Sequence, residues 1–135
     1  MKKTNLVSLR IITGDIKRLV QFYEEATSIK AKWSTDDFAE IKSDSFTLAI
    51  GSVRTLAFLG TTIAEPASNK SVIIEFLVDN VDRDFDRIKS LTEDVIQEPT
   101  TMPWGNRSLL FRDPDGNLVN FFTPITGPAK YKSIK

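Results

Sequence analysis

The sequence predicts an α+β fold in which two βαβββ repeats form a curved mixed sheet around a cup. Short segments with alternating apolar and polar residues indicate strands, and two segments with apolar residues three and four apart indicate helices. These segments follow the same order in both halves of the 135-residue chain. The repeat is visible where Ser8–Ile12 precedes Gly14-Asp-Ile and where Ile73–Leu77 precedes Asp79-Asn-Val. One helix covers one face of each unit, so the opposite faces are expected to close around a cavity.

The first unit is predicted within residues 1–60. Residues 6–12 alternate as a strand does, Gly14 ends that strand, and Asp15 is a good helix N-cap. The helix that follows is expected to end near Thr27-Ser28, and its apolar stripe consists of Ile16, Leu19, Val20, Tyr23 and Ala26. Three strands are expected next, at residues 29–35, 38–42 and 46–50. Residues 53–60 fit either an extension of the sheet or a short helix.

The second unit is predicted at residues 71–125, after a linker at 61–70 and before a loose tail at 126–135. A strand at 71–78 leads to a helix that Asp79 or Asn80 caps, with an inner face of Val81, Phe85, Ile88 and Leu91. A short strand at 95–98 and a loop at 99–106 follow. The unit then ends in a hairpin with strands at 107–112 and 118–123. The hairpin turn, Asp113–Asn117, contains Pro114 and Gly116, which suit a tight reversal of the chain.

The composition excludes several classes of function. The 18 basic and 18 acidic residues balance, so the chain lacks the basic footprint that nucleic acid or an anionic membrane needs. There is no cysteine and no histidine, which excludes serine–histidine and cysteine–histidine catalysis and leaves only oxygen ligands for a metal. The N-terminus lacks the apolar core of a signal peptide, and no apolar stretch has membrane-spanning length. We therefore expect a cytoplasmic protein.

Four short motifs around the internal repeat carry a family resemblance. They are Gly14–Tyr23, Val78–Asp82, Pro103–Gly105 and Asp113–Leu118. In this order the chain resembles the vicinal oxygen chelate superfamily, also described as glyoxalase/bleomycin resistance/dioxygenase-like, over about residues 5–125. The resemblance implies the two-unit fold and a homodimer. It does not imply one activity, because this fold hosts many chemistries.

In metal-dependent members, the resemblance implies a ligand on the first and the last strand of each unit, often histidine or glutamate. These positions fall at Ser8 and Ile73 on the first strands, at Asn120 on the last strand, and within Leu48–Ile50 in the first unit. None of them carries an imidazole or a carboxylate, which divalent metals prefer. We therefore expect a member that lacks the usual metal ligands, has no cofactor, and has no metal-dependent glyoxalase or dioxygenase activity.

Strand alternation predicts which side chains line the cup. Ser8 shares its face with Arg10, and Asn120 belongs to the strand that completes the second unit. Arg10 and Glu75 occupy equivalent places in the two repeats. They fit either an anchoring pair, with Arg10 on a ligand carboxylate or phosphate and Glu75 on a cation, or a pair that neutralises itself.

Two tryptophans are further candidates for stacking on a flat ligand. Trp33 lies in a predicted strand and fits core and site equally, whereas Trp104 precedes the hairpin on a loop and fits a site better. The complete set of predicted ligand-binding residues is Ser8, Arg10, Trp33, Glu75, Trp104 and Asn120.

The leading functional hypothesis is a metal-independent binding protein that holds a small planar organic molecule in the cup. One alternative is a metal-free lyase or isomerase that uses Glu75 as a base and Arg10 to stabilise an enolate or oxyanion. Another is a non-catalytic module whose cup is vestigial.

Overall fold

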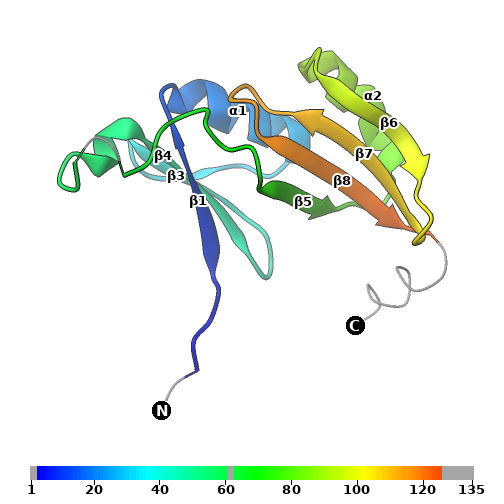
Figure 1. Ribbon diagram of the computed structural model, residues 1–135, viewed down its shortest axis with the longest axis horizontal. Coiled ribbons are helices and arrows are strands. Elements are labelled where there is room, and N and C mark those ends of the chain that lie inside the picture. The colour runs from blue at the N-terminus through cyan, green and yellow to red at the C-terminus, as the bar shows by residue number, and fades with distance from the viewer. Residues whose placement is uncertain (1–2, 61–62, 126–135) are drawn as a thin grey trace. The chain divides into compact units, whose positions relative to one another are not determined.

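The structure of the protein is a computed structural model that describes residues 3–60 and 63–125. The chain divides into two compact units, Met1–Ser68 and Asn69–Lys135, and each is described by itself (Figure 1). The predicted tail at 126–135 and part of the predicted linker lie outside the described residues, and the linker remains a prediction.

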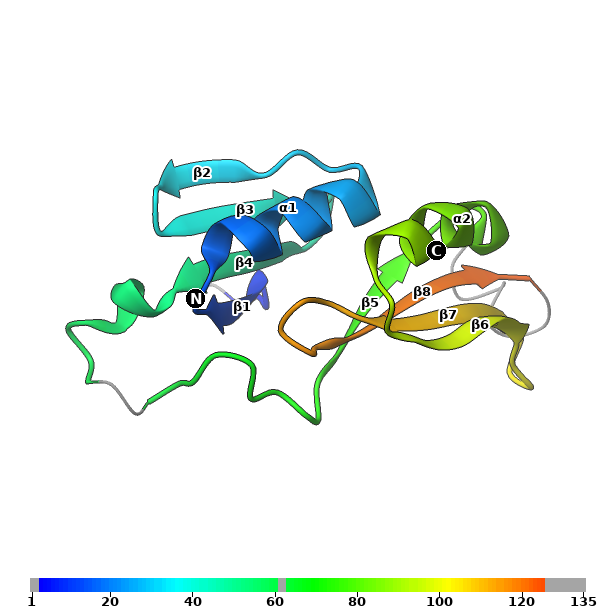
Figure 2. The same cartoon turned by 90° about the horizontal axis from the view of Figure 1, so that it is seen from above.

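The first unit is a four-stranded mixed sheet with one helix. Its elements are β1 (Ser8–Thr13), α1 (Ile16–Thr27), β2 (Lys32–Thr35), β3 (Phe38–Lys42), β4 (Thr47–Ser52) and the 3-10 helix η1 (Val53–Leu56). The strands run in the order β1-β4-β3-β2, and β1 is parallel to β4 while the other pairs are antiparallel. α1 packs against β3 and β4 and runs alongside them (Figure 2).

The apolar stripe of α1 explains the core of the first unit. Asp15 caps the helix by accepting a hydrogen bond of 3.2 Å from the backbone N–H of Arg18, as predicted. All five stripe residues are buried, and the alternation of β3 and β4 places Ala39, Ile41 and Ile50 beneath them. The same alternation turns the other side of the sheet, with Arg10 and Glu40, away from α1.

The second unit repeats this plan. Its elements are β5 (Ile73–Leu77), α2 (Val81–Leu91), β6 (Val95–Thr101), β7 (Asn106–Arg112) and β8 (Leu118–Pro124). The sheet order is β5-β8-β7-β6, with β5 parallel to β8, and this order is equivalent to that of the first unit. Its core face carries Ile74, Leu109, Phe111, Val119 and Phe121, and α2 packs against this sheet. The predicted α+β class with two βαβββ units is confirmed.

One predicted loop is wrong and one open alternative is resolved. Residues 99–101 belong to β6 rather than to a loop. Pro99 is compatible with this strand because β6 lies at the edge of the sheet and its register shifts between Gln97 and Thr100. Residues 53–56 form η1, because the Ser52 hydroxyl caps the turn by accepting a hydrogen bond from the N–H of Arg54. Arg54 also pairs with Asp37, and its hydrogen bond lowers the pKa of that carboxyl.

The inner face of α2 differs from the prediction at three positions. Val81 and Ile88 are buried as expected, but Phe85 and Leu91 are only half-buried. Asp84 is buried instead, with Arg87 and Arg83 nitrogens 3.3 and 3.5 Å from its Oδ1 atom. These arginines lie on the exposed side of the helix and reach back to the carboxylate. The sequence gave no signal that Asp84, an acidic residue beside the apolar stripe, is buried.

The hairpin turn between β7 and β8 is organised around the carboxylate of Asp113. Its Oδ1 accepts hydrogen bonds of 2.9 Å from the N–H groups of Asp115 and Asn117, and its Oδ2 accepts one of 2.8 Å from the Asn117 side chain. Gly116 has φ +83°, a conformation that glycine adopts without strain. The turn fixes the register of β8 against β7, and hence the face on which Asn120 lies.

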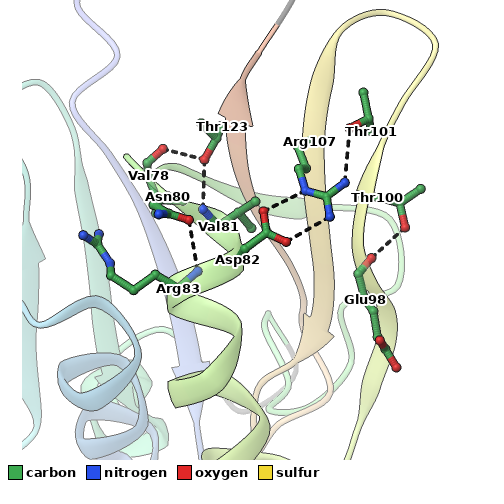
Figure 3. A network of polar contacts seen from close by, with 10 residues as sticks. All are labelled: Val78, Asn80, Val81, Asp82, Arg83, Glu98, Thr100, Thr101, Arg107 and Thr123. Carbon is green, nitrogen blue, oxygen red and sulfur yellow. Dashed lines mark hydrogen bonds and ion pairs between the residues drawn. The ribbon is translucent and has the colours of Figure 1, made fainter.

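A polar network joins the start of α2 to the strands (Figure 3). The hydroxyl of Thr123 donates to the carbonyl of Val78 at 2.8 Å and accepts from the N–H of Val81 at 3.1 Å. Arg107 on β7 donates two parallel hydrogen bonds, of 2.8 and 2.9 Å, to the carboxylate of Asp82. The hydrogen bonds from Arg107 hold the pKa of the Asp82 carboxyl below its ordinary value.

This ion pair predicts a small, pH-dependent effect on stability. Because Asp82 has a lowered pKa in the folded state, its contribution is present above the ordinary value of 3.8 and is lost as the pH falls through the folded pKa. Since both side chains are partly exposed, Arg107→Gln is expected to cost under about 1 kcal/mol at pH 7. Urea unfolding over a pH series checks this. A difference between the two proteins that persists undiminished at pH values below the folded pKa would contradict it.

Candidate functional site

The face of the second sheet that points away from α2 is the strongest candidate surface. This α2-distal face comprises Ile73, Glu75 and Leu77 of β5, Leu118, Asn120 and Phe122 of β8, and Ser108 and Leu110 of β7. Ile73 and Leu77 are 49% and 58% exposed, and Leu118, Leu110 and Phe122 are half-buried. The face therefore presents apolar side chains around a polar centre.

The polar centre is the pair formed by Glu75 and Asn120. The two residues are direct register partners on β5 and β8. The Nδ2 atom of Asn120 donates a hydrogen bond of 2.9 Å to Oε2 of Glu75. Glu75 is exposed, whereas Asn120 is only 8% exposed, and its Oδ1 atom accepts no hydrogen bond within residues 3–60 and 63–125. The pair thus places one exposed carboxylate and one buried amide oxygen without a partner among the described residues at the centre of this face.

The equivalent surface of the first unit is the α1-distal face. It contains Ser8, Arg10 and Ile12 of β1, Phe38, Glu40 and Lys42 of β3, and Thr47, Ala49 and Gly51 of β4. Ser8 and Arg10 are exposed. In register, Arg10 lies beside Ala49, which lies beside Glu40, and in the second unit Glu75 lies beside Asn120, which lies beside Leu110. The repeat therefore makes Ala49 the counterpart of Asn120.

The Arg10 side chain lies along the sheet above Gly51. A Cβ atom added to Gly51 would lie 3.6 Å from Cδ of Arg10 and 3.1 Å from Oγ1 of Thr55. A side chain at position 51 would thus crowd the stem of Arg10 and the start of η1. The sequence gave no reason to connect Gly51 with Arg10, because only the β1–β4 register brings them together.

Neither tryptophan is a register partner of Arg10 or Glu75. Trp33 pairs with Ala39 on β3, so it lies on the α1 side of the first sheet, opposite the face of Arg10, and is 41% exposed. Trp104 lies in the turn between β6 and β7, is 56% exposed, and is followed by Gly105 with φ +100°. Among the six predicted ligand-binding residues, the structure brings together Ser8 with Arg10 and Glu75 with Asn120. A ligand-binding role for any of the six remains a prediction.

A model of the Glyoxalase/Bleomycin resistance protein/Dioxygenase superfamily matches residues 5–121. The chain belongs to this superfamily. The match spans both units, in agreement with the motifs that suggested the resemblance.

The individual relatives support the fold. The uncharacterized protein YraH of Bacillus subtilis (strain 168) is 23% identical over 123 residues, which are 87% of this chain and 96% of YraH. The crystal structure of a glyoxalase/bleomycin resistance protein/dioxygenase family enzyme from Burkholderia phytofirmans PsJN has a TM-score of 0.80 at 16% sequence identity. The match covers 90% of this chain and 100% of the Burkholderia chain. The crystal structure of a glyoxalase/bleomycin resistance protein/dioxygenase from Nocardioides has a TM-score of 0.74 at 19% sequence identity. The match covers 94% of this chain and 87% of the Nocardioides chain.

The residues at the positions where the family resemblance implies metal ligands do not fit a metal. With the register resolved, these positions are Ser8, Ala49, Ile73 and Asn120, which together supply one hydroxyl and one amide. A divalent ion in this fold would need anionic oxygen or imidazole ligands. Within the part of the chain that the structure describes, no group of three or more acidic side chains is placed to hold a metal ion. The same part contains no helix that is long and apolar enough to cross a membrane.

Proposed function

We propose that this protein binds a small planar organic molecule on its α2-distal face without a metal ion. The observation that carries the proposal is the partly exposed apolar surface of Ile73, Leu77, Leu118 and Phe122 around the Glu75–Asn120 pair. Apolar area with a few convergent polar groups is the usual composition of a small-molecule site. Arg10 provides a cationic group on the equivalent face of the first unit.

The proposal of metal independence rests on the side chains at the expected ligand positions rather than on the fold. The superfamily positions that hold ligands in metal-dependent members carry a serine, an alanine, an isoleucine and an asparagine here. A bound molecule therefore takes its affinity from apolar contact and hydrogen bonds. A homodimer in the cytoplasm, as the sequence predicts, is part of the same proposal.

A thermal-shift panel tests the proposal. The panel consists of benzene, naphthalene and quinoline rings, each with a carboxylate, amide or amidine substituent, added to protein in the presence of a chelator. At least one ring system is expected to raise the melting temperature in a concentration-dependent way, because a ligand that binds only the folded state stabilises it. The dissociation constant of that compound is then measured by calorimetry.

Two alanine variants locate the binding surface. Phe122→Ala removes a half-buried aromatic ring from the α2-distal face, and we expect the affinity to fall roughly tenfold, which corresponds to about 1.4 kcal/mol. Phe58→Ala removes a ring of the same size that is fully exposed in the first unit, and the affinity should not change. If no compound of the panel binds, or if the two variants bind alike, the proposal fails. The first of these outcomes, with Arg10→Ala still folded, favours a vestigial module.

A further inference from the structure

The orientation of the Asn120 amide determines what its ligand must offer. Nδ2 of Asn120 donates to Oε2 of Glu75 at 2.9 Å, so the amide cannot turn over without placing its oxygen against the carboxylate. Oδ1 therefore remains the atom that points away from Glu75. It is buried and has no hydrogen-bond partner within the described residues, which is costly for a carbonyl oxygen.

The residues directly beside Asn120 on its face of the sheet supply no donor for this oxygen, and the hydroxyl of Ser108 on the same face makes no hydrogen bond to it. Across β7 its register partner is Leu110, and along β8 its neighbours on the same face are Leu118 and Phe122. All three side chains are apolar, so none can satisfy Oδ1. Because Oδ1 is buried in the free protein, a molecule reaches it only when a side chain that covers it changes rotamer.

The two acceptors at this site lie on neighbouring strands. Glu75 is exposed and offers the carboxylate oxygen lone pairs that Asn120 does not use, and Asn120 offers Oδ1 on the adjacent strand. Toward a bound molecule the Glu75 carboxylate is an anionic acceptor, and Oδ1 of Asn120 is a second acceptor. A planar cationic group with several N–H donors complements these two acceptors.

From this geometry we infer that the ligand carries an amidine, guanidine or protonated aminopyridine edge, which donates to Glu75 and to Oδ1 of Asn120 while its ring lies on the apolar side chains of the α2-distal face. This inference rests on the proposed function, because it specifies the chemical class of the molecule bound there. It also assigns Asn120 a positive role at a position where metal-dependent relatives are expected to hold a metal ligand. Arg10, by contrast, would select a carboxylate-bearing ligand.

Matched probes separate these two chemistries. Benzamidine, benzamide and benzoate, with their 2-naphthyl analogues, share ring systems and differ in the polar edge. In calorimetric titrations at low salt, the amidines are expected to bind at least roughly tenfold more tightly than the amides, and the carboxylates least tightly. Added salt should weaken the amidines more than the amides.

Three variants test whether the side chains of Glu75 and Asn120 cause the preference for amidines. Glu75→Gln is expected to weaken amidine binding roughly tenfold or more and to reduce the preference over the amide, whereas Glu93→Gln, an exposed change in the same unit, should leave binding unchanged. Asn120→Leu should keep or raise the melting temperature, because it removes a buried acceptor without a partner, and should also weaken amidine binding. If Asn120→Leu does not fold, Glu75→Gln alone decides the matter.

The outcomes distinguish the two levels of the proposal. If carboxylates or amides bind as well as amidines, or if Glu75→Gln leaves amidine affinity intact, the donor-edge inference is overturned while the binding function stands. If none of the six probes, and no member of the wider ring panel, binds, both fail together.

Discussion

Replacing Phe121 with alanine is expected to lower the free energy of unfolding by about 3–5 kcal/mol. The Phe121 ring is 1% exposed and packs edge-on against Phe76 and Phe111, with ring centroids 5.4 and 5.1 Å away. Its removal deletes the apolar contacts and leaves a cavity between the sheet and α2 that the rigid strands fill only in part. Urea unfolding, followed by the fluorescence of the tryptophans and by circular dichroism, measures the loss.

Phe122→Ala is the matched control, because it changes the same residue type one position along β8. Phe122 lies on the α2-distal face and is half-buried, so its loss should cost under about 2 kcal/mol, less than the loss of Phe121. The pair of variants thus tests the alternation on which the site depends. Equal losses at both positions would show that the register of β8 has been assigned to the wrong faces.

Replacing Asp113 with alanine is expected to cost about 3 kcal/mol or more. The buried carboxylate accepts hydrogen bonds from two backbone N–H groups and from the Asn117 side chain, and all three donors would lose their partner inside the turn. Hydrogen bonds to a charged group contribute about 1.5–3 kcal/mol each, and these three are not additive because they share one acceptor group.

Asp44→Ala in the turn between β3 and β4 is the control for Asp113. That turn occupies the equivalent place in the first unit, but Asp44 is exposed, and its loss should cost under about 0.5 kcal/mol. Denaturant unfolding of the two variants measures the difference. A cost for Asp113→Ala as small as that for Asp44→Ala would contradict the account of the hairpin turn.

Much of the fold could be predicted because local signals and the internal repeat agreed. The Asp15 cap of α1, the hairpin turn and the succession of strands and helices along the chain were each visible in short stretches of sequence. The extent of β6 was not, since Pro99 is a breaker that an edge strand tolerates, and edge position is a property of the assembled sheet. The burial of Asp84 depended on arginines that fold back from the exposed side of α2.

For the site, strand alternation could predict only which residues of one strand share a face. Alternation correctly grouped Ser8 with Arg10 within one strand. The direct pairing of Glu75 with Asn120 and the counterpart position Ala49 required the register between strands that are distant in sequence. The placement of Trp33 away from Arg10 likewise came from the β2–β3 register. The orphaned Oδ1 of Asn120 had no sequence signal, because the hydrogen bond to Glu75 decides which end of the amide is left without a partner.

Metal independence is tested by a calorimetric titration of Ni²⁺, Zn²⁺ and Mn²⁺ into untagged protein that has been treated with a chelator. The double variant Ile73→His plus Asn120→Glu serves as positive control, because it places an imidazole and a carboxylate beside Glu75 on the α2-distal face. We expect no stoichiometric metal binding by the natural sequence, measurable binding by the double variant, and ligand affinity that is the same with and without chelator. Tight stoichiometric binding of any of these metals by the natural sequence, with ligand affinity lost in chelator, would contradict it.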